Sequence, residues 1–224
     1  MKLGAMGTGR KADGKAHGKA NRKAQTEAIT LVLVTGIIIA LVGSAYMWGK
    51  PMIDKRSVVT QFASAVKFME DLDAKIVNMA GTCSFEGACE ESLDLPVAGI
   101  LYLDVASNSI IYTITVNQPL IFGDGEVLLN TADNGTIARY GEKPGVISLR
   151  GERTEGLYNV IFRLRYRELD SQEPWKGYKI ELKKEGKDTG SSKVLISYGG
   201  PYTAQGGAYN NGDLVLSRIK VQPI

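Results

Sequence analysis

Residues 22–51 read RKAQTEAITLVLVTGIIIALVGSAYMWGKP, and the interpretation of the whole chain begins with this stretch. From Ala28 to Trp48 it contains 21 consecutive residues without a charge. A helix of that length is about 31 Å long, which matches the ~30 Å hydrocarbon core of a bilayer. The stretch therefore predicts a membrane-spanning helix. A soluble core helix is one alternative. A cleaved secretory signal is another, although its apolar core is usually only about 7–15 residues long.

The leader, residues 1–24, carries the charge asymmetry of the chain. It holds seven of the 27 Lys and Arg residues and one of the 24 Asp and Glu residues, a net charge of +6. This leaves 20 basic and 23 acidic residues in 25–224, a net charge of −3. The basic end of a span stays in the cytoplasm, so residues 52–224 are expected outside the cell. Because the basic excess is confined to the leader, the pI near 8.7 gives no reason to expect a nucleic-acid partner.

The residues after the span predict a second, amphipathic stretch of helix over 51–81. Pro51 has no backbone N–H, so we expect a kink or a short break there, and Gly81 is the expected end. Apolar residues then recur every three or four positions and predict one buried face. They are Val59, Phe62, Val66, Met69, Leu72, Ile76 and Met79, with Lys67, Glu70, Asp71 and Lys75 mostly on the opposite face.

From about Pro96 the pattern changes to the two-residue alternation of β-strands. Seven segments rich in β-branched and aromatic residues predict strands. They cover 99–105, 109–116, 145–151, 157–169, 177–185, 193–200 and 214–222, and 122–126 and 185–191 have the composition of hairpin turns. The expected fold class is α+β: a long N-terminal helix kinked near Pro51, followed by an antiparallel sandwich-like or barrel-like β domain. The expected organisation is a leader at 1–24, an apolar helix at 25–50, its amphipathic continuation at 51–81 and an external β domain at 82–224.

The two cysteines, Cys83 and Cys89, are separated by five residues. This spacing fits neither the C-x-x-C redox motif nor a zinc site, which would need two further ligands. A small-loop disulfide in an extracytoplasmic domain is the preferred interpretation, and two unpaired thiols are the alternative.

Few residues have the spacing of a catalytic or metal site. His17, the one histidine, lies in the leader, and no phosphate-binding loop, zinc or EF-hand motif appears. We therefore expect no enzyme, no cofactor and no metal. The oxygen-rich stretch 209–213 could hold calcium but has the composition of a turn. Asn134 in NGT meets the rule for an N-linked glycan.

The strand segment 158–167 alternates apolar residues with a mainly cationic set. Arg163, Arg165 and Arg167 in that set are expected on a solvated strand face, and an anionic glycan or a neighbouring subunit is the alternative partner.

The order of parts resembles the archaeal type IV pilin superfamily, which includes adhesion pilins and archaellins. The resemblance covers residues 1–80 and rests on a basic leader, KAQTEAITLVL and a long helix before a β domain. It implies a class III signal peptide that a prepilin peptidase cuts after Lys23 and Ala24, so that the mature chain starts at Gln25. The chain departs from the commonest family pattern in having alanine before the cut and an acid, Glu27, at the third mature position instead of the fifth.

Glu27 stands at the mouth of the apolar stretch, where a bare carboxylate facing hydrocarbon costs several kcal/mol unless it is paired or protonated. Cleavage after Ala24 would create an α-amino group with a pKa of about 7.7–8.0, which could neutralise Glu27 of its own or an adjacent chain. The alternative is a carboxylate solvated by lipid headgroups, without a partner.

These observations predict a structural subunit of an extracellular type IV pilus-like filament, which polymerises with itself through its N-terminal helix. The chain would be a membrane precursor before assembly. The resemblance implies the prepilin peptidase, an assembly ATPase and a membrane platform as partners. An uncleaved, signal-anchored cell-surface binding protein, comparable to the archaellum stator proteins, is the main alternative, and an envelope enzyme is a third.

Overall fold

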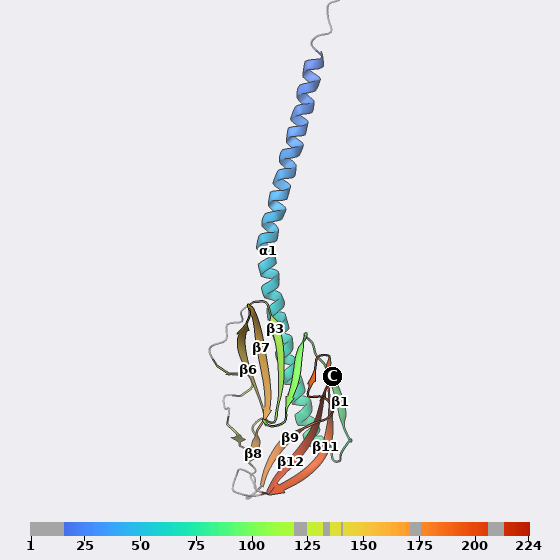
Figure 1. The fold of residues 1–224 in the computed structure, drawn as a ribbon, viewed down its shortest axis with the longest axis vertical. Helices are drawn as coiled ribbons and strands as arrows, with labels where there is room; N and C mark the ends of the chain where they lie inside the picture. Colours follow the sequence, from blue (N-terminus) through green and yellow to red (C-terminus); the bar gives the residue numbers. More distant parts are fainter. Residues whose placement is uncertain (1–15, 119–124, 132–134, 140, 171–175, 206–212) are drawn as a thin grey trace, which may run out of the picture. The chain divides into compact units, whose positions relative to one another are not determined.

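The computed structural model of the chain describes residues 16–118, 125–131, 135–139, 141–170, 176–205 and 213–224. The chain divides into two compact units between Ile53 and Asp54. We call Asp54–Ile224 the head. The expected α+β class is confirmed, because one long N-terminal helix is followed by a strand-rich domain with two sheets (Figure 1).

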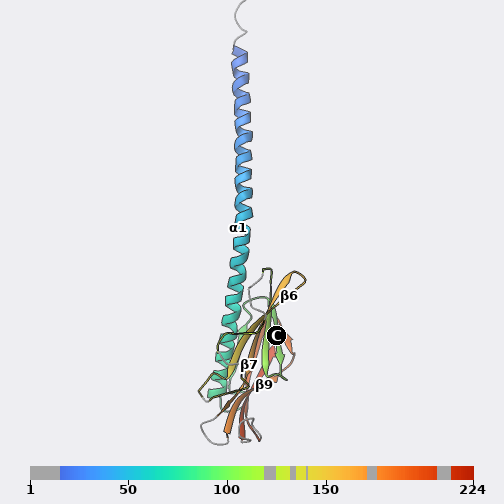
Figure 2. The same ribbon diagram turned by 90° about the vertical axis from the view of Figure 1, so that its left-hand side faces the viewer.

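Helix α1 extends from Ala16 to Thr82 and contains Pro51 within it. Figure 2 draws it as one uninterrupted coil, so the expected break at Pro51 is wrong. Proline leaves only the carbonyl of Met47 without its i+4 donor, and the helix continues on both sides of this one missing bond. A bend of the axis at Pro51 stays a prediction. The helix ends one residue after Gly81, close to the expected position.

The first sheet has the strand order β1-β11-β12-β9-β8-β5. Its strands are β1 (Glu90–Asp94), β11 (Lys193–Gln205), β12 (Asp213–Pro223), β9 (Lys176–Lys184), β8 (Glu168–Asp170) and β5 (Ile137–Ala138). Two of its pairings are parallel, β12 with β9 and β5 with β8. The expectation of an antiparallel domain is therefore correct for most pairs and wrong for these two.

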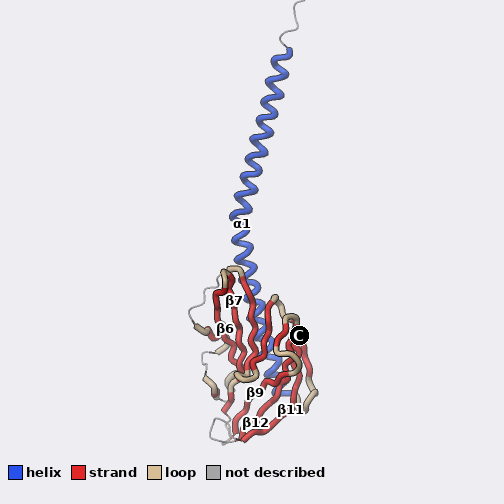
Figure 3. The backbone as a smooth tube through the Cα atoms, viewed as in Figure 1, coloured by secondary structure: helices blue, strands red, loops and turns tan. Residues whose placement is uncertain are grey.

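The second sheet has the order β10-β2-β3-β7-β6-β4 and is antiparallel throughout its described pairs. Its strands are β10 (Thr189–Gly190), β2 (Gly99–Asp104), β3 (Ser109–Val116), β7 (Leu157–Tyr166), β6 (Gly145–Thr154) and β4 (Val127–Leu128). Figure 3 shows the strands in red, with β6 and β7 in one group and β9, β11 and β12 in the other. Each of the seven expected strand segments contains a strand.

The expected hairpin turn at 185–191 does not form as such, and the one expected at 122–126 lies mostly outside the described residues. Residues 189–190 are β10, which pairs with β2 of the other sheet, and β12 lies between β9 and β11. The segment after β9 therefore leads to β11, which is separated from β9 by β12, instead of forming a hairpin with a neighbouring strand. Within 122–126, residues 122–124 lie outside the described residues, and β4, which follows, pairs with β6 and not with β3. A glycine-rich turn indicates that the chain reverses, but it does not determine which strand occupies the neighbouring position.

The core of the head is built from the second part of α1 and the inner faces of both sheets. Met69, Leu72, Ile76 and Met79 are buried as expected. Val58 is buried in place of Val59, which is 52% exposed, and the buried stripe also includes Ala65 and Phe68. Two ring contacts join α1 to the second sheet: Phe62 to Phe162 at 5.7 Å and Phe68 to Tyr112 at 5.3 Å between centroids.

Candidate assembly segment and the head that carries it

The segment Thr26–Ile53 of α1 is apolar and has no buried side chain. Large aliphatic side chains are exposed around the whole helix; Leu31, Val32, Ile39 and Leu41 are each more than 60% exposed. At roughly 25 cal/mol per Å², apolar area of this extent strongly favours removal from water. We call Thr26–Ile53 the apolar segment.

Three hydroxyl groups in the apolar segment are already paired within the helix. Thr30 donates to the carbonyl of Thr26, Thr35 to that of Leu31 and Ser44 to that of Ala40, each at 2.8 Å. An unpaired hydroxyl in hydrocarbon costs several kcal/mol, and these bonds remove that cost. The segment is therefore compatible with lipid, or with a bundle of other helices, despite its polar residues.

Among the described residues, α1 is long and apolar enough to cross a membrane, and none of its most apolar window is buried within the chain. Length and composition alone are weak grounds, because a core helix or a signal sequence meets the same condition. Tyr46 and Trp48, 66% and 86% exposed, lie near the end of the segment, where aromatic side chains suit a membrane–water interface.

The glycines of the apolar segment leave open space beside the helix. A Cβ atom added at Gly36, Gly43 or Gly49 would meet nothing within 4 Å. Small residues spaced along a helix let another helix approach closely in lipid or in a filament core.

The expected processing residues lie at the start of the described helix. Lys23, Ala24 and Gln25 are helical in the backbone, and the structure describes nothing of their side chains. Glu27 is exposed and forms no ion pair with any side chain that the structure describes. The backbone thus carries the expected processing residues and the acid on one helix, within five consecutive residues.

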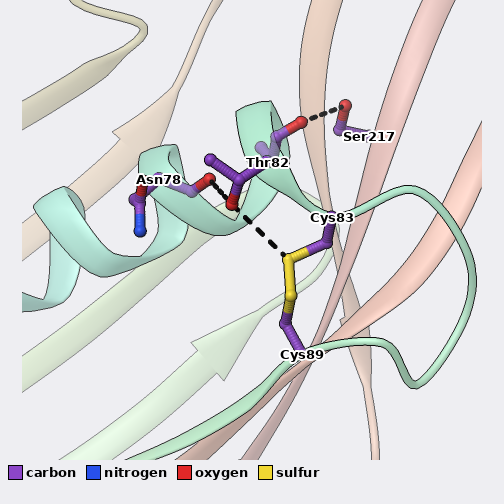
Figure 4. The surroundings of a disulfide bond; sticks show 6 residues. Asn78, Thr82, Cys83, Cys89 and Ser217 are labelled. Atoms are coloured by element: carbon purple, nitrogen blue, oxygen red, sulfur yellow. Dashed lines mark hydrogen bonds between the residues drawn. A yellow bond between two sulfur atoms is a disulfide. The ribbon is translucent and has the colours of Figure 1, made fainter.

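The expected disulfide between Cys83 and Cys89 is present and closes the loop that leaves α1 (Figure 4). The helix end is held by hydrogen bonds: Thr82 Oγ1 donates to the carbonyl of Asn78 at 2.7 Å, and Ser217 Oγ from β12 donates to the carbonyl of Ala80 at 3.4 Å. Cross-linking of residues six apart disfavours the unfolded chain and fixes the path from α1 into β1.

Asp73 is an acid on the buried face of α1, which sequence patterning missed. It is 9% exposed and accepts a hydrogen bond from the Tyr166 hydroxyl at 3.1 Å. Burial raises the pKa of Asp73, and the bond from Tyr166 and the charge of Lys143 oppose that change. Burial, together with the nearby Asp73 carboxylate, raises the pKa of Tyr166 well above its usual value. The position of Asp73, one residue after Leu72 of the buried face, was the available signal that this acid is buried.

Asn108 joins the two sheets and was also missed. Its side-chain amide donates to the carbonyls of Tyr166 at 3.2 Å and Ile180 at 2.7 Å, and its carbonyl oxygen accepts from the Leu182 N–H at 2.8 Å. Tyr166 ends β7 of the second sheet, whereas Ile180 and Leu182 belong to β9 of the first. Asn108 has a φ of 52°, which asparagine tolerates better than most residues.

The three arginines expected on one wet face are divided. Arg163 is exposed and Arg165 half-buried, but Arg167 is 3% exposed. The Arg167 guanidinium donates to the carbonyl of Lys143 at 3.2 Å and contacts Glu142 at 3.5 Å. The solvated-face prediction is therefore wrong for Arg167, because β7 ends at Tyr166 and the chain crosses there to β8 in the first sheet.

The remaining expected sites give little chemistry. Asn134 and residues 209–212 lie outside the described residues, and the described part of the chain contains no cluster of three or more metal-ligating side chains. An open hollow of about 680 Å³ is lined by residues that include Ile100, Lys187, Thr189, Gln222 and Ile224.

Comparison of the chain with protein families, with curated proteins and with solved structures gave no match.

Proposed function

We propose that the chain is a structural subunit of an extracellular type IV pilus-like filament, which polymerises through residues 25–50. A prepilin peptidase would remove the leader between Ala24 and Gln25, and an assembly ATPase with its membrane platform would drive polymerisation. The proposal rests on the family resemblance of residues 1–80. The observation that carries it is the exposed apolar segment on the same helix that forms part of the core of the head.

The physical argument concerns what can cover the apolar segment. Its exposed aliphatic side chains need hydrocarbon or other apolar helices around them, and open space beside Gly36 and Gly43 permits close helix contact. A bilayer would supply the first environment and a filament core the second. Movement of the subunit from one to the other is what filament assembly requires.

Removal of the leader would assist that movement in two ways. The +6 leader holds the N-terminus on the cytoplasmic side, and its loss removes that anchor. The new α-amino group would be largely cationic at neutral pH and could balance Glu27 of the same or an adjacent chain. An acid that forms no ion pair with a described side chain would thereby gain a partner at the moment the subunit becomes free to assemble.

The test replaces Glu27 with Gln in the full chain. We expect Glu27→Gln to insert into the membrane normally and to give markedly fewer filaments, measured as sheared extracellular subunit relative to membrane-bound subunit on an immunoblot. Thr30→Val is the matched control, since the Thr30 hydroxyl is already paired within the helix. Undiminished filaments from Glu27→Gln would remove the amine-pairing mechanism.

A second variant changes the proposed cleavage site. Substitution of Lys23 and Ala24 is expected to leave a precursor of higher mass in the membrane and no filaments. Normal processing of that variant would place the cut elsewhere, and a wild-type chain that keeps its leader would favour the anchored binding protein.

A further inference from the structure

The outer face of the second sheet carries a contiguous apolar surface across β2, β3 and β7. Strand register places Ile100 opposite Thr113 and Thr113 opposite Ile161, and in the next row Tyr102 opposite Ile111. Directly opposed residues have Cβ atoms about 4.5–5.5 Å apart, so these side chains adjoin. Ile100 and Tyr102 are 58% and 41% exposed. Isolated exposed apolar residues are ordinary, whereas adjoining ones mark contact surfaces.

Cationic side chains border this surface on β6 and β7. Arg150 lies opposite Ile161, and Arg163 lies opposite Ile111. Arg163 is exposed and forms no ion pair with a described residue, while Arg150 contacts Glu152 at 3.2 Å and keeps 63% of its side chain exposed. We call the set Ile100, Tyr102, Ile111, Ile161, Arg150 and Arg163 the sheet patch.

The exposed face of α1 within the head carries charged and small side chains instead of large apolar ones. Ala63, Lys67, Glu70, Asp71 and Ala74 are all exposed and recur at helical spacing. Glu70 and Asp71 form no ion pair with any described side chain. The small Ala63 and Ala74 would let another surface approach the helix closely. We call these five residues the helix face.

The sheet patch and the helix face lie on opposite sides of one layered unit. Phe62 and Phe68 of α1 pack on Phe162 and Tyr112, which belong to the inner face of the second sheet. The residues of the sheet patch alternate with that inner set and point away from α1, and the helix face points away from the sheet. One chain therefore cannot bring its own two surfaces together. A contact between them is heterologous and repeats from copy to copy.

We propose that the sheet patch of one head docks on the helix face of a second copy, with Arg163 against Glu70 and Asp71. Charge complementarity favours the second copy. The patch is apolar with an exposed cation, Arg163, which forms no ion pair with a described residue although its charge acts on Asp104, and the helix face offers the acids Glu70 and Asp71 beside small residues and Lys67. The inference rests on the proposed function in naming a further copy of the chain as partner. It extends that function, since it adds a contact between heads to the one between apolar segments.

The test places a photo-crosslinking amino acid at position 102 of the full chain, in cells that produce it, and maps the joined peptides by mass spectrometry. We expect a dimer whose second peptide contains residues 63–74. Position 203, exposed on β11 of the first sheet, is the matched control and is expected to give no such product. Crosslinks to a different protein, to lipid or to another part of the chain would overturn the inference, as would the absence of any dimer.

Charge exchange gives an independent measurement. Arg163→Glu and Asp71→Arg are each expected to lower dimer yield by about tenfold through like-charge repulsion, and the double variant to recover it to within about threefold of the wild type. Thr203→Glu, at the control position on β11, is expected to change nothing. Circular dichroism of each variant shows whether the head is folded. A double variant that is folded but does not recover the dimer yield would contradict the docking geometry.

The two proposals fail differently. Filaments whose crosslinks lie outside 63–74 would leave the filament subunit in place and remove this contact. If position 102 crosslinks to residues 63–74 in membranes of cells that form no filaments, the contact between heads is supported and the proposed filament function is excluded.

Discussion

Replacement of Asn108 by Ala is expected to cost the head a large part of its stability. The change deletes two donated bonds and leaves the buried Leu182 N–H without its acceptor. An unsatisfied buried N–H costs about 1–3 kcal/mol, and each lost bond about 0.5–1.5 kcal/mol. Alanine at a φ of 52° adds a strain of about 1 kcal/mol relative to asparagine. The expected loss is about 3–7 kcal/mol, against a usual total of about 5–15 kcal/mol.

The assay is urea unfolding of the full chain in detergent micelles, followed by circular dichroism, with a thermal scan beside it. For a domain of this size, at about 2–4 °C per kcal/mol, the loss corresponds to a fall in Tm of roughly 6–28 °C. Asn108→Gly is expected to cost less than Asn108→Ala, because glycine accepts the positive φ without strain. Asn159→Ala, whose side chain bonds to Thr115 at 2.9 Å at an exposed position, is the matched control and is expected to cost under about 1 kcal/mol. An Asn108→Ala head within about 1 kcal/mol of the wild type would refute the reasoning that this side chain holds the two sheets together.

Three further changes test the head. Mutating Cys83 and Cys89 together to Ser is expected to lower stability by about 2 kcal/mol through the short loop, and native protein without reductant is expected not to react with a thiol reagent; rapid labelling would contradict the bond. Gly145→Ala is expected to cost about 1–3 kcal/mol, since the added Cβ would clash with the Asp73 carboxylate. Gly81→Ala, with nothing within 4 Å, is expected to be neutral or stabilising, and equal unfolding midpoints for the two variants would argue against this packing. Because burial raises the pKa of Asp73, the folded state loses stability as pH rises from the unfolded pKa through the folded one. The gain in unfolding free energy from Asp73→Asn is therefore expected to be larger at pH 7 than at pH 4. A difference in unfolding free energy between variant and wild type that does not change with pH would contradict this expectation.

Hydrophobic periodicity was sufficient for the main elements of the fold but not for the short strands β1, β4, β5 and β10. The three-and-four spacing from Phe62 to Met79 identified the buried face of α1, and two-residue alternation located the main strands. Both patterns succeed because burial on one face of a helix or strand is a local property of the sequence. Val59 was misplaced because Val58 beside it is equally apolar and lies on the stripe.

Pairing between strands was not predictable in the same way. The insertion of β12 between β9 and β11 depends on packing across the whole domain, so the parallel pair and the crossover at β10 have no local signal. Pro51 was misjudged because a helix tolerates one missing hydrogen bond when both sides continue it. Strand alternation wrongly placed Arg167 in solvent, and nothing in the pattern singled out Asp73, because the burial of both follows from partners distant in sequence.

The candidate assembly segment was accessible from sequence because an uncharged run long enough to span a bilayer is a composition signal. The sheet patch was not accessible from sequence, because it exists only when the strand register brings Ile100, Ile111 and Ile161 side by side.

We propose that a freed N-terminus turns a membrane precursor into a filament subunit, and intact-mass with N-terminal analysis of protein purified from the cell surface decides whether it does. We expect a chain that begins at Gln25, as glutamine or cyclised pyroglutamate, recovered from extracellular filaments. A surface protein that still carries residues 1–24 would exclude this conversion.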